Sequence, residues 1–301
     1  MFTTSTGRLH PVWAFVVSAL FSVLAFLVAG YVAGAIAGDR VLLLEAIFRP
    51  LSALLLIALF LWMLTAADHV EGHHFAALGL PRVKGWLKQF TFGCLLAFGL
   101  AVLAIVPIEI WGHTRTRFLL SVHTLPRVGT VLLVLLVGAL AEELMFRGYP
   151  FQHLEQGIGA IGAITIFSVM FGAVHLANPG ASLWGLINTI LIGVLLSISY
   201  LRTRALWLPW GIHFGWNFSL GLLFGLPVSG LRLFNVVVRT AVSGPTWVTG
   251  GSYGVEASAT AVVIILVGIV MVWKLPLAPL AQPGLPLPET EHRDSLSGIQ
   301  P

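Results

Sequence analysis

Long apolar runs occupy most of this chain, and they constrain its fold more than any other feature. A helix needs about 20 mainly apolar residues to cross a bilayer, and helices are the expected spanning form because lipid cannot satisfy open backbone groups. We therefore expect an all-α, polytopic membrane helix bundle with about eight transmembrane helices. The expected spans are Val12–Ala37, Val41–Ala66, Phe90–Ile108, Val128–Phe146, Ala160–Ala177, Ser182–Leu201, Leu206–Phe224 and Ala257–Trp273.

The composition supports a membrane protein and excludes several other classes. Of the 301 residues, 57% are hydrophobic and 9% are charged, whereas a soluble globular protein carries roughly 25% charged residues. An ordinary soluble enzyme and a disordered chain are therefore excluded. The net charge of +4 does not indicate a nucleic-acid partner, because the basic residues lie mostly between apolar runs, as membrane orientation requires. The single cysteine, Cys94, excludes a disulfide framework and a cysteine-based metal site.

The basic residues also predict an orientation. The first apolar run is longer than the 7–15 residues usual in a signal peptide, so we interpret it as a membrane anchor. The positive-inside rule then weakly favours cytoplasmic N- and C-termini for a multi-pass protein of the cell membrane. The basic residues expected inside are Arg8, Arg82, Lys84, Lys88, Arg202, Arg204, Lys274 and Arg293, and those expected outside are Arg40, Arg115, Arg117, Arg127, Arg232 and Arg239.

A glycine pattern, Gly157-Ile-Gly159-Ala-Ile-Gly162, matches the dinucleotide-binding fingerprint. That fingerprint requires a preceding strand and an acidic residue about 20 positions later, and this sequence indicates neither. We interpret these glycines as small residues that let membrane helices approach closely.

Ionisable residues inside membrane spans are costly and usually mark function, and three spans contain such groups. The fourth span ends in Glu142, Glu143 and Arg147, the fifth contains His175, and the seventh contains His213. Glu143 and Arg147 are four residues apart and can form an ion pair on one helix face. Glu142 lies about 100° round the helix from Glu143, so one acid can pair with the arginine while the other points into the bundle.

Two further residues complete the candidate site. Asn217 lies one turn beyond His213 and places an amide on the same stripe of the helix. Phe171 lies one turn before His175 and can form a wall of the pocket. An acid, two imidazoles and an amide can activate water and hold an oxyanion. Glu142, His175 and His213 are equally a recognised hydrolytic zinc set. A structural interpretation, in which these polar groups only hold helices together, is the alternative.

The ordered motifs Glu-Glu-x-x-x-Arg, Phe-x-x-x-His and His-x-x-x-Asn, which run from Glu142 to Asn217, resemble those of the CPBP family of intramembrane proteases. This family includes the Rce1-type CAAX prenyl endopeptidases. The eight-helix layout and the segment Leu78-Gly79-Leu80-Pro81-Arg82 before the third span are also similar to the family. The resemblance divides the chain into N-terminal transmembrane helices with an amphipathic segment (1–125), a CPBP-type catalytic core (126–225), a loop with the last transmembrane helix (226–274), and a disordered Pro-rich tail (275–301).

The resemblance implies endoproteolysis of a membrane-presented substrate, such as a CAAX-like or prenylated peptide. Carried over by position, Glu142 is the general base and positions water with His175, while His213 and Asn217 stabilise the oxyanion. Glu143, Arg147 and Phe171 support the site structurally. Members of the family are described both as metalloproteases and as glutamate-dependent enzymes, so zinc on Glu142, His175 and His213 stays open as a cofactor.

The expected partners are a membrane-anchored peptide or protein substrate and the lipid bilayer, with no nucleic acid. Two alternatives on the same helix bundle are a catalytically silent scaffold or immunity protein and a proton-coupled transporter. In the transporter, Glu142 and His175 would act as a proton relay.

Overall fold

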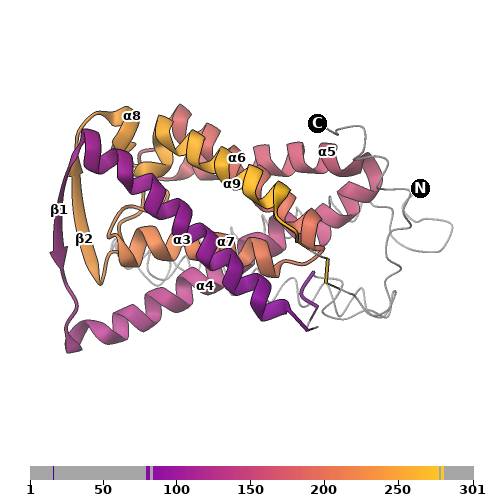
Figure 1. Cartoon of the computed structure of the whole chain (residues 1–301), viewed down its shortest axis with the longest axis horizontal. Helices are drawn as coiled ribbons and strands as arrows, with labels where there is room; N and C mark the ends of the chain where they lie inside the picture. The colour runs from indigo at the N-terminus through magenta and orange to yellow at the C-terminus, as the bar shows by residue number, and fades with distance from the viewer. Residues whose placement is uncertain (1–15, 17–78, 82–83, 278, 281–301) are drawn as a thin grey trace.

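The computed structural model describes residues 16, 79–81, 84–277 and 279–280 of the chain. The spans expected at 12–37 and 41–66, residue 16 apart, lie outside these ranges, and so does most of the Pro-rich tail. The described part is an α-helical bundle (Figure 1). Its main helices are α3 (Trp86–Trp111), α4 (Leu125–Arg147), α5 (Tyr149–Val174), α6 (Leu183–Thr203), α7 (Trp207–Phe218) and α9 (Ala259–Lys274).

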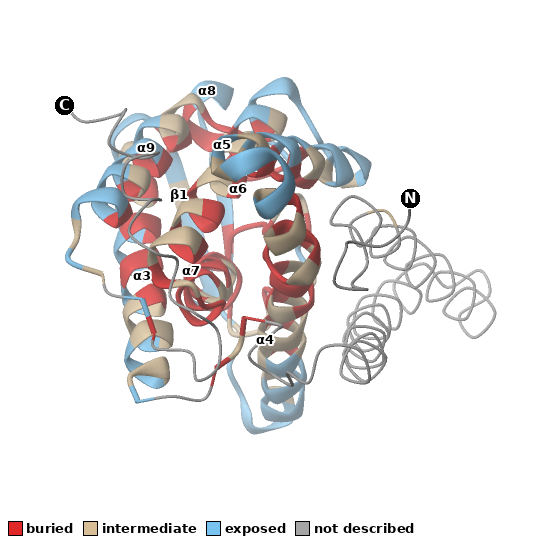
Figure 2. Ribbon diagram, turned by 90° about the vertical axis from the view of Figure 1, so that its right-hand side faces the viewer, coloured by how far each residue is buried: buried red, intermediate tan, exposed pale blue. Residues whose placement is uncertain are grey.

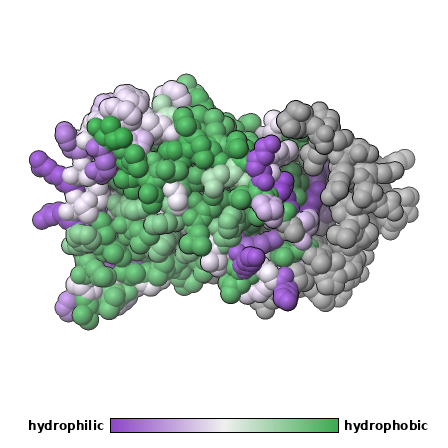
Figure 3. All heavy atoms as spheres, viewed as in Figure 1, coloured by the Kyte–Doolittle hydropathy of each residue, from purple (hydrophilic) through white to green (hydrophobic). Residues whose placement is uncertain are grey.

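These six helices correspond to the last six spans expected from the sequence. Within the described residues, three helical stretches are long and apolar enough to cross a membrane: Trp86–Trp111, Val122–Ala177, which contains α4 and α5, and Leu183–Thr203. Helix α9 is apolar but shorter. The surface agrees, because a broad apolar region covers the middle of the molecule and hydrophilic residues lie beside it (Figure 3). The protein is therefore a helical membrane protein, and the total of about eight spans stays a prediction.

Helix α5 differs from the expectation in two ways. It begins at Tyr149, well before the expected start near Ala160, and it is bent at Gly159, whose φ of 81° is not helical. Gly157 and Gly159 are exposed, and a Cβ atom added to Gly159 would meet nothing within 4 Å. Within the described residues, Gly159 therefore packs against no other helix. Gly159 instead permits a backbone conformation that residues with a side chain rarely adopt.

A two-stranded antiparallel ribbon, formed by β1 (His113–Phe118) and β2 (Val238–Ser243), was not expected from the apolar runs. Its signal is the alternation of arginine and threonine in His113-Thr-Arg-Thr-Arg-Phe118, a period of two that is typical of a strand. The ribbon lies at one end of the bundle and pairs the α3–α4 connection with the segment that follows α7 (Figure 1). Short elements complete the chain: η1 (Val122–Thr124), η2 (His175–Ala177), the π-helix η3 (Ser219–Leu223), α8 (Thr246–Thr249) and η4 (Val255–Ala257).

Helices α3 and α7 pack backbone against backbone. A Cβ atom on Gly211 would lie 2.2 Å from the carbonyl oxygen of Phe90, and one on Gly93 would lie 2.6 Å from the carbonyl oxygen of Leu208. A Cβ atom on Gly215 would come within 2.7 Å of Cα of Cys94 on α3. Small residues at helix interfaces permit this close approach in membranes. The buried residues gather between the helices and around α7 (Figure 2).

Candidate active site

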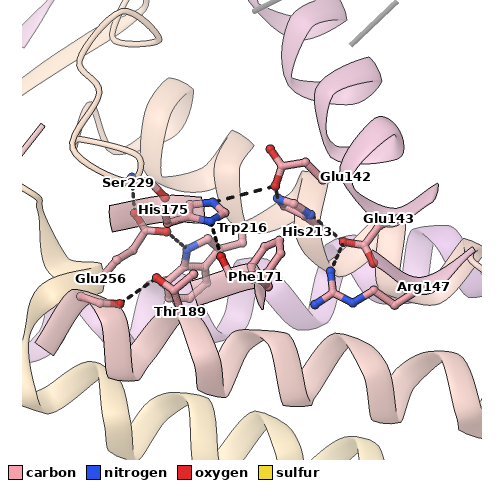
Figure 4. Close-up of polar contacts among 11 residues, drawn as sticks. Glu142, Glu143, Arg147, Phe171, His175, Thr189, His213, Trp216, Ser229 and Glu256 are labelled. Atoms are coloured by element: carbon pink, nitrogen blue, oxygen red, sulfur yellow. Dashed lines mark hydrogen bonds and ion pairs between the residues drawn. The ribbon is translucent and has the colours of Figure 1, made fainter. Parts of the chain in front are cut away.

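The candidate site forms where the ends of two helices meet the middle of a third (Figure 4). Glu142 and Glu143 lie in the last turns of α4, His175 follows directly after α5, and His213 lies on α7. Helix α5 stops near His175 because Pro179 follows, and the residue before a proline disfavours the helical conformation. Asn178 accordingly has an extended backbone, with ψ 149°.

Glu143 and Arg147 form a buried ion pair at the base of the site. Arg147 Nη1 lies 3.2 Å from Glu143 Oε1, and both side chains are 0% exposed. The second guanidinium nitrogen donates to the backbone carbonyl of Gly193 at 3.2 Å. The guanidinium carbon also lies 4.5 Å from the centre of the Phe171 ring, which adds a cation–π contact. The ion pair expected from the four-residue spacing is therefore present.

Glu143 has a second contact that the spacing did not indicate. Its Oε1 atom lies 2.7 Å from Nδ1 of His213, so the carboxylate holds the imidazole as well as the arginine. In the same way, Nδ1 of His175 lies 2.7 Å from the carbonyl oxygen of Phe171. Because a carbonyl and a carboxylate can only accept, Nδ1 carries the hydrogen in both rings. The Nε2 atoms are then the ones that change between lone pair and N–H when a ring gains a proton.

Glu142 faces both of these Nε2 atoms. Its Oε2 lies 3.9 Å from Nε2 of His175 and 3.8 Å from Nε2 of His213. This oxygen is buried and accepts no hydrogen bond from the described residues, while the side chain as a whole is 34% exposed. The separations are too long for direct hydrogen bonds, so a polar contact between Glu142 and either imidazole would have to pass through a water molecule.

The same three side chains are the ones that would hold a zinc ion in a metal-dependent enzyme. Ligands about 2.0–2.1 Å from a tetrahedral zinc lie roughly 3.3–3.4 Å from one another. The separations of 3.8 and 3.9 Å are longer, and no metal-binding group of three or more His, Cys, Asp or Glu side chains occurs among the described residues. In this arrangement the Oε2 atom of Glu142 and the Nε2 atoms of His175 and His213 therefore do not fit a tetrahedral zinc.

The two remaining predicted residues, Phe171 and Asn217, differ in how closely they contact the glutamates and histidines of the site. Phe171 is buried, and its ring centre lies 4.6 Å from that of His175 and 6.0 Å from that of His213, so its ring packs beside both imidazoles. Asn217 is half-buried one turn beyond His213 on α7. Its side chain makes no hydrogen bond to the residues that the structure describes, so it is adjacent to the contact network and is not part of it.

Helix α7 is held in place by its tryptophans. Three indole N–H groups of this helix donate to three different elements, each at 2.9 Å. The pairs are Trp207 with the carbonyl of Pro81, Trp210 with the carbonyl of Leu136, and Trp216 with Oε1 of Glu256. The described part of the segment before the third span, Gly79–Pro81, thus contacts the start of α7, while Leu78 and Arg82 lie outside the described residues.

Glu256 is a buried acid that the sequence reasoning missed. It is 4% exposed and accepts hydrogen bonds from the Trp216 indole and from the backbone N–H of Ser229. Burial raises the pKa of its carboxyl group above the ordinary value of 4.5, and these hydrogen bonds partly oppose the rise. Asn188 on α6 donates to the backbone carbonyls of Glu256 and Ser258, both at 2.8 Å. The signal in the sequence was an acidic residue directly before the last apolar run.

The fold and the site define a helical membrane protein with a carboxylate and two histidines converging from three helices. Residues 124–219 match the family model of Rce1-like type II CAAX prenyl endopeptidases. The matched region runs from η1 to the end of α7 and contains all three motifs. The match supports the resemblance to the CPBP and Rce1-type family, and this part of the chain is similar to an Rce1-like protease domain. No curated protein and no solved structure gives a significant match to this chain.

Proposed function

We propose that this protein is an intramembrane endopeptidase in which Glu142 and His175 activate a water molecule for attack on a membrane-presented peptide bond. One observation carries the proposal: the buried Oε2 of Glu142 lies 3.9 and 3.8 Å from the Nε2 atoms of two histidines. A carboxylate and imidazoles at this separation can hold a nucleophilic water by hydrogen bonds and accept its proton.

The proposed reaction uses the chain's own side chains. Glu142 takes a proton from the water while the water oxygen bonds to the carbonyl carbon of the substrate. When the tetrahedral intermediate collapses, the carbon–nitrogen bond breaks, and the proton on Glu142 moves to the leaving amine. The carboxylate is thereby regenerated, so the same residue acts first as base and then as acid.

His213 is proposed to stabilise the oxyanion. The Glu143 carboxylate beside Nδ1 favours the protonated imidazolium, which donates its Nε2–H toward the negative oxygen. Asn217, one turn further along α7, is proposed as a second donor because its amide has no hydrogen bond within the described residues. In this scheme Glu143 and Arg147 do not touch the substrate and act by orienting His213.

The proposed substrate is a membrane-anchored peptide or protein, with a CAAX-like or prenylated C-terminus as the first class to test. The support is the family match together with a site formed by apolar helices. The same match favours a hydrolase over the silent scaffold and the proton-coupled transporter.

The test is cleavage of a membrane-anchored peptide by purified protein in liposomes. Glu142→Ala, His175→Ala and His213→Ala are each expected to abolish turnover. Glu109→Gln, which alters an exposed carboxylate at the end of α3, is the matched control and is expected to keep full activity. Full activity of Glu142→Ala would refute the mechanism, and the metal content of the active wild-type protein would separate metal-dependent from glutamate-type chemistry.

A further inference from the structure

The β1–β2 ribbon carries three arginines on one face. Arg117 lies directly opposite Arg239 in the antiparallel register, and Arg115 lies opposite Ala241. Side chains alternate between the two faces of a strand, so these residues share a face with His113 and Ser243. All three arginines are exposed, and none forms an ion pair or a side-chain hydrogen bond with any residue that the structure describes.

Among the residues that the structure describes, no acidic side chain pairs with this face. Like charges directly opposite each other destabilise a sheet, and Arg117 and Arg239 occupy such a pair. The nearby acid, Glu109 at the end of α3, accepts a hydrogen bond from Thr114 at 3.0 Å. Thr114 belongs to the other face of the ribbon, so Glu109 is engaged away from the arginines. An external anion would remove the repulsion.

The position of the ribbon at the helix ends is where the surface of a membrane would be expected. It crosses the end of the bundle between the end of α3 and the start of α4 (Figure 1), so its residues stay near the helix ends. Trp111, the last residue of α3, and Trp247 of α8 are both exposed, with ring centres 5.6 Å apart. Exposed tryptophans at helix ends are typical of the membrane–water interface. Figure 3 shows hydrophilic residues at this end beside the broad apolar surface.

We propose that the arginine face of the ribbon, Arg115, Arg117 and Arg239, binds anionic phospholipid headgroups. A guanidinium group matches the geometry of a phosphate and can donate two parallel hydrogen bonds to it. Lipid phosphates are the anions present at this depth, directly continuous with the apolar surface of the helices. The lipid contact would anchor this end of α3 and α4 at the membrane surface. It does not depend on the proposed proteolysis.

The experiment compares lipid binding by three detergent-solubilised proteins at low ionic strength. The first is the wild type, and the second is the Arg115→Gln/Arg117→Gln/Arg239→Gln triple variant. The third, Lys84→Gln/Lys88→Gln/Lys274→Gln, removes the same charge from exposed lysines at the other ends of α3 and α9. Each is titrated with short-chain phosphatidylglycerol and phosphatidylcholine, with folding monitored by thermal melting.

Wild type is expected to prefer phosphatidylglycerol. Each basic residue near an anionic surface changes the affinity for anionic lipid about fivefold. The arginine triple variant is therefore expected to bind phosphatidylglycerol on the order of 100-fold more weakly than the wild type. The lysine variant is expected to change less than the arginine variant. If the arginine triple variant does not fold, Arg115→Gln alone, which leaves the opposed pair intact, is expected to weaken binding about fivefold.

Four results would overturn the proposal. They are equal binding of both lipids by wild type, an equal loss in the lysine variant, binding of inorganic phosphate as tight as that of phosphatidylglycerol, and displacement of the lipid by a stoichiometric acidic peptide. The last two would assign the face to a free anion or to a protein partner.

Discussion

Glu142 and Glu143 are adjacent in sequence, yet their removal should affect the stability of the protein to very different extents. Glu143 is fully buried and contacts both Arg147 and Nδ1 of His213. In Glu143→Ala, the buried guanidinium loses its carboxylate and keeps only the Gly193 carbonyl as a hydrogen-bond acceptor. Breaking a buried ion pair by removing one partner costs about 3–5 kcal/mol. Glu142 Oε2 accepts no hydrogen bond within the described residues, so Glu142→Ala should change stability by less than about 1 kcal/mol.

The assay is thermal unfolding of both variants in detergent, followed by tryptophan fluorescence, in parallel with peptide cleavage. A loss of 3–5 kcal/mol corresponds to a decrease in melting temperature of roughly 5–8 °C for a chain of 301 residues. Glu142→Ala should melt with the wild type and be inactive. A Glu143→Ala variant that melts with the wild type, or a Glu142→Ala variant that is destabilised equally, would show that the assignment of the two acids is wrong.

A double variant separates the contribution of the ion pair to stability from the proposed role of Glu143 in orienting His213. In Glu143→Leu/Arg147→Leu both buried charges are replaced by apolar groups, which is often neutral or stabilising. The double variant should therefore be more stable than Glu143→Ala, and its effect should not be the sum of the single changes. Activity should stay low because Nδ1 of His213 has lost its acceptor. Recovery of activity together with stability would contradict the orienting role of Glu143.

Three further predictions concern α7 and its neighbours. Trp216→Phe leaves Oε1 of Glu256 without its indole donor and should destabilise the protein by about 1–3 kcal/mol in chemical denaturation. Because burial raises the pKa of Glu256, the folded state holds that proton more tightly than the unfolded state. Its contribution to stability is therefore complete below pH 4.5 and is lost as the pH rises through the raised pKa. Glu256→Gln should reduce the dependence of the melting temperature on pH, measured in melting curves recorded at a series of pH values. Gly211→Ala places a Cβ atom 2.2 Å from the carbonyl oxygen of Phe90 and should cost about 1–3 kcal/mol or more and lower activity. Gly99→Ala on α3, where a Cβ atom meets nothing within 4 Å, is the control and should leave both the stability and the activity unchanged.

Helical spacing accounts for how much of the site could be read from the sequence. Four residues make slightly more than one helical turn, so periodicity alone indicated that Arg147 pairs with one of the two adjacent glutamates. Periodicity could not indicate that Glu143 also contacts His213, because that contact joins α4 to α7 across the bundle. Periodicity could not identify Glu256 as a buried, hydrogen-bonded acid for the same reason, because its partners lie on α7 and in the turn at Ser229.

Hydropathy predicted the helices better than their interruptions. An apolar run shows where a helix can cross lipid, and α3, α4, α6, α7 and α9 lie close to their expected positions. The bend at Gly159 and the β1–β2 ribbon depend on backbone conformation and on strand pairing between distant segments. Neither leaves a signal in average hydropathy.

The sequence by itself determined that this is a helical membrane protein, which ionisable residues lie within its apolar spans and which family its core resembles. Those features depend on local composition and on spacing within single helices. Only the tertiary structure decided that Glu142 faces the two histidines, that Glu143 orients one of them, and that three arginines share one face of a ribbon. These are contacts between helices and strands far apart in the chain, and their geometry is set by close packing such as that of Gly211 against α3.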